Sequence, residues 1–144
     1  MRFTGRLAIA VLLALPAPSP GADDFVVIVN PSVAGTTMRR PDLAAVFLKK
    51  AARWGNGKLA VPVDQSGTSA VRTSFSESVL RMSVATTVQY WQKQLSAANT
   101  LGPPLTKASD VEVVAFVGKT EGAVGYVSKA ATLPAGVRAV VVID

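Results

Sequence analysis

VPVDQSGTSAVRTSF (residues 61–75) contains a predicted strand, a polar loop and the start of a predicted helix. The apolar run 59–63 indicates a buried strand, and Pro62 must lie at its end or edge because proline has no N–H to donate to a neighbouring strand. Residues 64–68 form the loop. The buried face of the helix is marked by apolar side chains spaced four residues apart: Val71, Phe75 and Val79. A strand that leads through a loop into a helix is typical of an α/β fold.

Further strands are predicted on both sides of this stretch. Residues 25–29 (FVVIV) form a continuous apolar run, as expected for a strand buried on both faces of a sheet. Apolar runs at 123–127 and 137–143 are also predicted strands. Residues 31–37 and 97–105 contain Gly and Pro and are predicted to be connections.

Three further helices alternate with these strands. One is expected to begin at Pro41, and another after Ser109, which forms a capping box with Glu112. A third follows a break at Met82–Ser83, and its expected buried face is an apolar stripe: Val84, Val88, Trp91 and Leu95. We therefore expect an α/β lobe with a mostly parallel or mixed sheet of about five strands flanked by helices.

The N-terminal segment has the three parts of a secretory signal peptide. Arg2 and Arg6 precede a short apolar run at 7–15, and small residues and prolines follow at 16–22. The run is too short to span a bilayer. We assign residues 1–22 to the signal peptide and 23–144 to one mature domain, which we expect to be exported to the periplasm.

The composition excludes several kinds of chemistry. The sequence has no cysteine and no histidine, so disulfides, Cys/His zinc sites, Ser-His-Asp triads and cysteine nucleophiles cannot form. Asp64 is the one carboxylate not explained by a helix start or an exposed face, and a single carboxylate does not make an acid–base pair. Its simpler interpretation is a turn aspartate that bonds to its own backbone. We predict neither an enzyme nor a cofactor, and no metal site.

The net charge is modest. The chain has 15 Lys and Arg against 9 Asp and Glu, and without residues 1–22 it keeps 13 basic residues and a net charge of +4. Adjacent basic residues occur at 39–40 and 49–50, and the aromatic residues are too scattered to stack bases. Nucleic acid is not a predicted partner, and the mature chain is not expected to be an integral membrane protein.

The loop at Ser66-Gly67-Thr68 is the candidate binding site. It lies between a predicted strand and a helix N-terminus, where backbone N–H groups and two hydroxyls favour an anion. Gly67 lets an oxyanion approach the backbone closely. The alternative is that Ser66 or Thr68 simply caps the helix.

Four stretches together resemble the second lobe of the phosphate-type substrate-binding proteins of bacterial ABC importers, a branch of the type 2 periplasmic binding fold. They are VVIVNPS (26–32), PDLAAVFLKKAARWGNG (41–57), VPVDQSGTSAVRTSF (61–75) and EGAVGYVS (121–128). The most specific parts are residues 46–49 with Trp54, and the G-A-V-G-Y-V motif at 122–127. The resemblance implies a periplasmic-binding-protein-like fold over nearly the whole mature chain.

The resemblance also implies a phosphate site. In the two-lobed relatives an S-G-T turn binds phosphate oxygens through N–H groups and hydroxyls, and Ser66, Gly67 and Thr68 match that turn. The relatives have an arginine four residues before the serine, where this chain has Pro62. Arg72, one turn into the helix, is a candidate to supply the missing charge.

Two hypotheses follow. In the first, a single lobe binds phosphate or another small oxyanion weakly and is associated with an ABC-type phosphate importer. In the second, the lobe is a periplasmic interaction or accessory module that kept the fold, lost the ligand and binds another periplasmic protein. The Ser-Gly-Thr turn favours the first hypothesis, and Pro62 favours the second.

We predict that the mature protein begins at Ala22 or Asp23, because a small residue then precedes the cleavage point. The intact mass of the protein recovered from the periplasm tests this. A full-length chain retained in the cytoplasm would contradict it.

Overall fold

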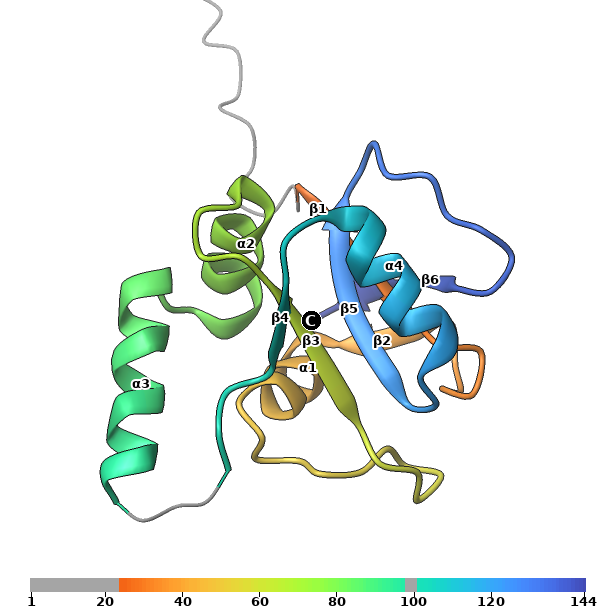
Figure 1. Ribbon diagram of the computed structural model, residues 1–144. Helices are drawn as coiled ribbons and strands as arrows, with labels where there is room; N and C mark the ends of the chain where they lie inside the picture. Colours follow the sequence, from red (N-terminus) through yellow and green to blue (C-terminus); the bar gives the residue numbers. More distant parts are fainter. Residues whose placement is uncertain (1–23, 98–100) are drawn as a thin grey trace, which may run out of the picture.

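The computed structural model describes residues 24–97 and 101–144 (Figure 1). The predicted signal peptide, residues 1–22, lies outside the described residues. The strands are β1 (Phe25–Val29), β2 (Thr37–Arg39), β3 (Val61–Gln65), β4 (Leu105–Lys107), β5 (Ala123–Ser128) and β6 (Arg138–Ile143). The helices are α1 (Arg40–Phe47), α2 (Ala70–Phe75), the π-helix η1 (Ser76–Leu80), α3 (Val84–Ser96) and α4 (Asp110–Lys119).

Within the described residues, six strands form one sheet in the order β2-β6-β1-β5-β3-β4. Strand β2 pairs in parallel with β6, and β3 pairs in parallel with β4 and β5. Strand β1 runs antiparallel to β5 and β6. The sheet is therefore mixed, which confirms the predicted α/β class. The sequence does not predict β2 or β4, because a strand of three residues is too short to show a pattern.

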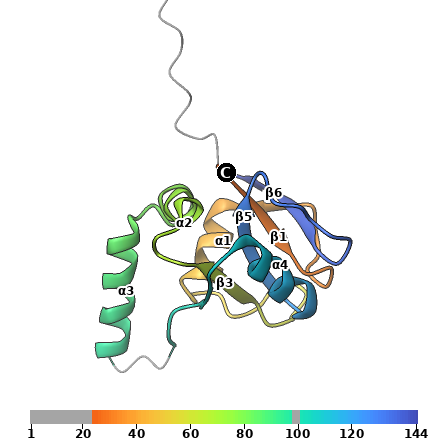
Figure 2. The ribbon, with the colours of Figure 1, turned by 45° about the horizontal axis from the view of Figure 1, so that its top comes forward.

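Strand β1 is buried on both faces, as predicted. Val27 and Val29 belong to a core that also contains α1, α2 and η1 side chains. Ile28 points into a second core with Val113 and Val117 of α4. Figures 1 and 2 show α1 and α4 on opposite sides of the sheet. Helices thus cover both faces, and the β3–α2 junction lies next to the larger core.

A cluster of aromatic rings fixes α2 against the sheet. The Phe75 ring stacks on Tyr126 of β5 with centroids 3.9 Å apart and planes 7° apart. Phe25 and Phe47 also contact the Phe75 ring, with centroids 5.3 and 4.6 Å away. The predicted buried face is confirmed, since Val71 and Phe75 of α2 and Val79 of η1 are buried.

Strand β3 begins and ends two residues later than predicted. It spans Val61–Gln65 instead of 59–63, because Val63 to Gln65 pair with β4. Asp64 and Gln65 therefore lie in the sheet and not in a loop. Pro62 is the second residue of β3, before the pairing with β4 begins, so its missing N–H costs no β4 hydrogen bond.

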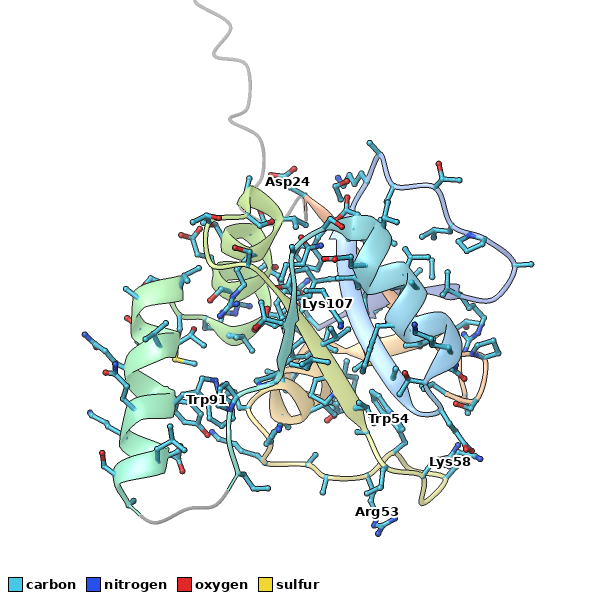
Figure 3. All side chains as sticks on the ribbon, in the orientation of Figure 1. Asp24, Arg53, Trp54, Lys58, Trp91 and Lys107 are labelled. Carbon is cyan, nitrogen blue, oxygen red and sulfur yellow. The ribbon has the colours of Figure 1, made fainter. Side chains whose placement is uncertain are left out.

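The predicted buried stripe of α3 is wrong in part. Trp91 is buried, but Val88 and Leu95 are 47% and 56% exposed, and Thr87 is buried instead. Helix α3 lies at the periphery of the molecule, and Figure 3 shows Trp91 pointing from it toward the rest of the fold. The Thr87 hydroxyl lies 3.1 Å from that of Ser76 in η1. Contact with η1 thus sets the helix orientation and leaves part of the apolar stripe in solvent.

Two glycines of the 122–127 motif are required by packing. A Cβ at Gly125 would lie 2.7 Å from Val113 Cγ1 and 2.8 Å from Val63 Cγ1. Gly122 has φ +76°, and a Cβ there would meet the Leu59 carbonyl. The missing side chain at Gly125 lets α4 lie directly on the sheet.

We expect Gly125→Ala to lower the free energy of unfolding by about 1–3 kcal/mol, because the added methyl overpacks the core. Gly118→Ala is the matched control, since a Cβ there has ordinary contacts of 3.6 and 3.7 Å. It should be neutral or stabilising by about 0.5–1 kcal/mol. Urea melts compare the two variants, and equal losses would contradict the close approach of α4.

Candidate functional site

Residues 66–68 form an accessible loop between β3 and α2. Ser66 is half-buried, and Gly67 and Thr68 are exposed. The Ser66 and Thr68 hydroxyl oxygens lie 3.1 Å apart. A Cβ at Gly67 would have one neighbour within 4 Å, a Val84 side-chain carbon at 3.8 Å, so space next to its backbone is open. The three predicted binding residues therefore lie together on one open surface.

Ser66 and Thr68 do not cap helix α2. The N-cap of α2 is Ser69, and its side chain makes no capping hydrogen bond. Its hydroxyl donates instead to Gln65 Oε1 at 3.2 Å. The Ser66 and Thr68 side chains interact with each other in the loop, so neither of them occupies the N-cap position.

A buried ion pair lies beneath the loop. Arg72 Nη1 is 3.2 Å from Asp64 Oδ2, and Asp64 and Arg72 are only 4% and 8% exposed. The same Nη1 donates to the Gln65 carbonyl oxygen at 2.6 Å. Arg72 Nε is buried and makes no hydrogen bond within the described part of the chain. Arg72 thus binds the strand residues that precede the loop.

Tyr126 completes the environment of the Asp64 carboxylate. Its hydroxyl donates to Asp64 Oδ1, which also accepts the Gln65 backbone N–H at 3.0 Å. Burial raises the pKa of Asp64, and the Arg72 cation and these hydrogen bonds offset part of that rise. Burial and the Asp64 charge raise the pKa of Tyr126, so the phenol stays protonated and donates. Asp64 does accept a backbone N–H, that of Gln65, but it is a strand residue in a buried ion pair, so its interpretation as a turn aspartate is wrong.

Gln65 connects this network to α4. Its side-chain nitrogen donates to Asp110 Oδ1 at 2.7 Å and to the Tyr126 carbonyl at 3.0 Å. Asp110, in the first turn of α4, also accepts the Ser128 hydroxyl at 2.6 Å. Burial disfavours the Asp110 charge, but the bonds from Ser128 and Gln65 outweigh it and lower the Asp110 pKa. The end of β3, immediately before the loop, is therefore joined to both β5 and α4.

Sequence reasoning does not identify Gln65 and Tyr126 as members of the site. The only signal at Tyr126 is its place in the 122–127 motif, which sequence alone attributes to a strand. Arg72 is identified, but as a candidate ligand for an anion. Its side chain lies under the loop against Asp64 instead of projecting into solvent.

Two comparisons rest on sequence. No protein-family model matches this chain, and no curated protein matches it.

Solved structures show a clear likeness of fold. An ABC-type phosphate transport receptor from Vibrio cholerae matches with a TM-score of 0.64 and 18% identity, over 83% of this chain and 46% of that one. PstS from Borrelia burgdorferi matches with a TM-score of 0.62 and 15% identity, over 83% of this chain and 47% of that one. The resemblance predicted from the sequence is confirmed at the level of fold. The chain spans just under half the length of these proteins.

A double-mutant cycle tests the ion pair beneath the loop. We expect Arg72→Met or Asp64→Asn alone to lower the free energy of unfolding by about 3–5 kcal/mol, because each leaves a buried charge or donor without its partner. The double variant should lose clearly less than the sum of the two losses. Denaturant melts give the three values, and additive losses would show that the two side chains do not stabilise each other.

Proposed function

We propose that this chain is a non-enzymatic, exported anion-binding domain with the fold of the phosphate substrate-binding proteins. Residues 66–68 hold phosphate or a similar oxyanion. The observation that carries the proposal is the exposed pair of hydroxyls, 3.1 Å apart, beside the open backbone of Gly67. Hydroxyl and N–H donors are the groups that neutral loops use to bind oxyanions.

Arg72 acts in this proposal as a positioning residue. Its charge is balanced by Asp64 at 3.2 Å, and its Nη1 is already bonded to the Gln65 carbonyl. It therefore fixes the backbone immediately before Ser66 without contacting the anion. The affinity then rests on the dipoles of hydroxyl and N–H groups.

Binding is weak in this proposal. One lobe leaves the far side of the anion in water, which competes for each hydrogen bond. We expect a dissociation constant in the high micromolar to millimolar range, about −4 to −6 kcal/mol.

The cellular setting is part of the same proposal. Residues 1–22 are the signal peptide, residues 23–144 form one domain, and the protein acts in the periplasm beside an ABC-type phosphate importer. The likeness to transport receptors supports this setting. None of the helices in residues 24–97 and 101–144 has the length and apolarity needed to cross a bilayer.

A second candidate function is a periplasmic interaction module without a ligand. Pro62 in place of the relatives' arginine and the neutralisation of Arg72 by Asp64 favour it. The exposed Val88 and Leu95 side chains on α3 also favour it. In this case the partner is another periplasmic protein.

A phosphate titration by calorimetry decides between the two. We expect weak binding that Gly67→Val abolishes, because the branched side chain blocks approach to the backbone. Gly136→Val is the matched control: a Cβ there also meets open space, and the site lies in another loop. It should leave phosphate binding unchanged.

Two outcomes would contradict this picture. Submicromolar phosphate binding by a monomer would exclude an open, one-sided site. No heat with phosphate or sulfate at tens of millimolar would favour the interaction module.

A further inference from the structure

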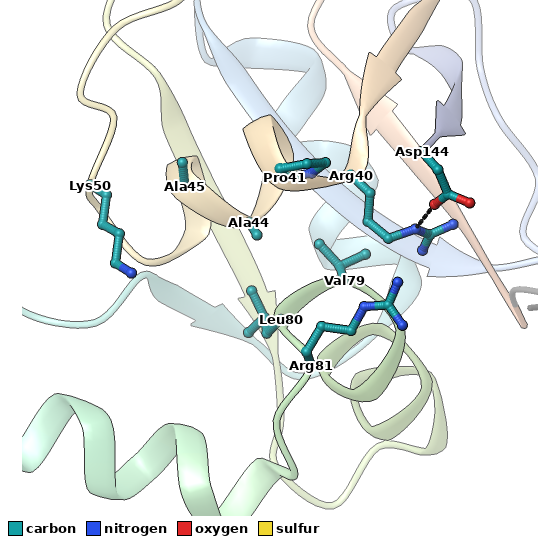
Figure 4. Close-up of a pocket in the computed structure, with 9 residues that line it drawn as sticks. All are labelled: Arg40, Pro41, Ala44, Ala45, Lys50, Val79, Leu80, Arg81 and Asp144. Atoms are coloured by element: carbon teal, nitrogen blue, oxygen red, sulfur yellow. Dashed lines mark hydrogen bonds and ion pairs between the residues drawn. The ribbon is translucent and has the colours of Figure 1, made fainter.

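A cavity of about 410 Å³ lies between α1, η1 and the end of β6 (Figure 4). This volume falls in the range of small-molecule sites. Its floor is apolar and includes Pro41, Val79 and Leu80. Its rim carries Arg81 and Lys50. We call it the α1–η1 pocket, and none of its residues belongs to the 66–68 loop.

The pocket has an excess of positive charge. Arg40, Lys50 and Arg81 line it together with one acidic residue, Asp144. Asp144 is bound to Arg40, whose Nε lies 2.8 Å from its Oδ1. Lys50 and Arg81 are exposed and make no ion pair within the described part of the chain. Two cations are therefore left without a close ion pair, although the Arg81 charge, after that of Arg40, helps to lower the pKa of Asp144 from a longer distance.

The two cations stand at opposite ends of the pocket. Figure 4 shows Arg81 near Arg40 at one end, Lys50 at the other, and the apolar floor between them. An inorganic ion could use one end only and would gain nothing from the floor. A longer organic molecule can contact both cations and cover the apolar surface.

The backbone at Arg81 is a second unusual feature of the pocket. Arg81 follows the π-helix η1 and has φ +57°, a left-handed conformation in which glycine or asparagine is usual. π-Helical turns and left-handed non-glycine residues both occur preferentially at functional sites. Here both features line the same pocket, and an arginine side chain replaces the glycine that the backbone alone would favour.

We propose that the α1–η1 pocket binds an organic dianion whose two acidic groups are separated by an apolar segment. One acidic group bonds to the Arg81 guanidinium and the other contacts the Lys50 ammonium. The apolar segment lies on Pro41, Val79 and Leu80. The site is separate from the proposed phosphate loop, so either can fail without the other.

Calorimetric titration with suberate, an apolar-chain dicarboxylate, tests the proposal in phosphate-free, low-salt buffer. We expect saturable binding, weaker binding of octanoate, and no binding of the diamine of the same chain length. Arg81→Gly should weaken suberate binding about tenfold or more, since it removes a charge-assisted hydrogen bond. Its melting temperature should equal or exceed that of the native protein, because glycine suits the left-handed backbone.

Lys49→Gly is the matched control. Lys49 also has a left-handed backbone, with φ +55°, and its replacement removes one positive charge, but it does not line the α1–η1 pocket. Its suberate affinity should stay within about twofold of the native value. Lys50→Gln should weaken suberate binding and leave octanoate binding unchanged.

The proposal is overturned if suberate does not bind, if the diamine binds as well as suberate, or if Arg81→Gly keeps the native affinity. It is also overturned if sedimentation shows that the pocket is covered by a second copy of the chain, released by Arg81→Gly.

Discussion

The buried ion pair between Asp64 and Arg72 constrains the strand-to-helix turn on which the candidate site depends. Asp64 lies in β3 and Arg72 in α2, so the pair joins the two elements that flank residues 66–68. Both side chains are at least nine-tenths buried, and either charge alone would be strongly unfavourable there. The conformation of the loop is therefore set by a contact that no ligand needs to complete.

Both cores of the protein support this ion pair. The Tyr126 hydroxyl donates to Asp64, and the Tyr126 ring stacks on Phe75. These two contacts connect the carboxylate to the larger core. Gln65 donates to Asp110 at the start of α4, which packs on the opposite face of the sheet. Both faces of the sheet are therefore hydrogen-bonded to the last two residues of β3, immediately before the loop. Sites supported in this way are held more rigidly than a free surface loop.

Local patterns in the sequence predict much of this fold but not its contacts between distant residues. The buried strand 25–29, the Ser109 cap of α4 and the loop at 66–68 each depend on neighbouring residues, and the structure has all three. The Glu112 side chain accepts the Ala108 N–H instead of the Ser109 N–H of a capping box. The predicted buried stripe of α3 is wrong in part because the orientation of the helix depends on its contact with η1. The periodicity of the sequence cannot reveal that contact. The end of β3 is set by pairing with β4, whose residues lie 42 positions further along the chain than their partners. Tyr126 and Arg72 meet Asp64 only through the topology, so their roles are visible only in three dimensions.

The chain presents positive charge in two different ways, and the difference decides what each surface can bind. Beneath the 66–68 loop the Arg72 cation is buried and paired with Asp64, so the proposed oxyanion binding rests on short-range dipoles and depends little on salt. At the α1–η1 pocket Lys50 and Arg81 are exposed and make no close ion pair among the described residues, so the proposed attraction of a dianion is electrostatic and weakens as salt is added. The first surface suits a small oxyanion that fits between hydroxyl and N–H groups. The second requires an apolar body, because exposed charges in water contribute little unless burial of apolar surface accompanies them.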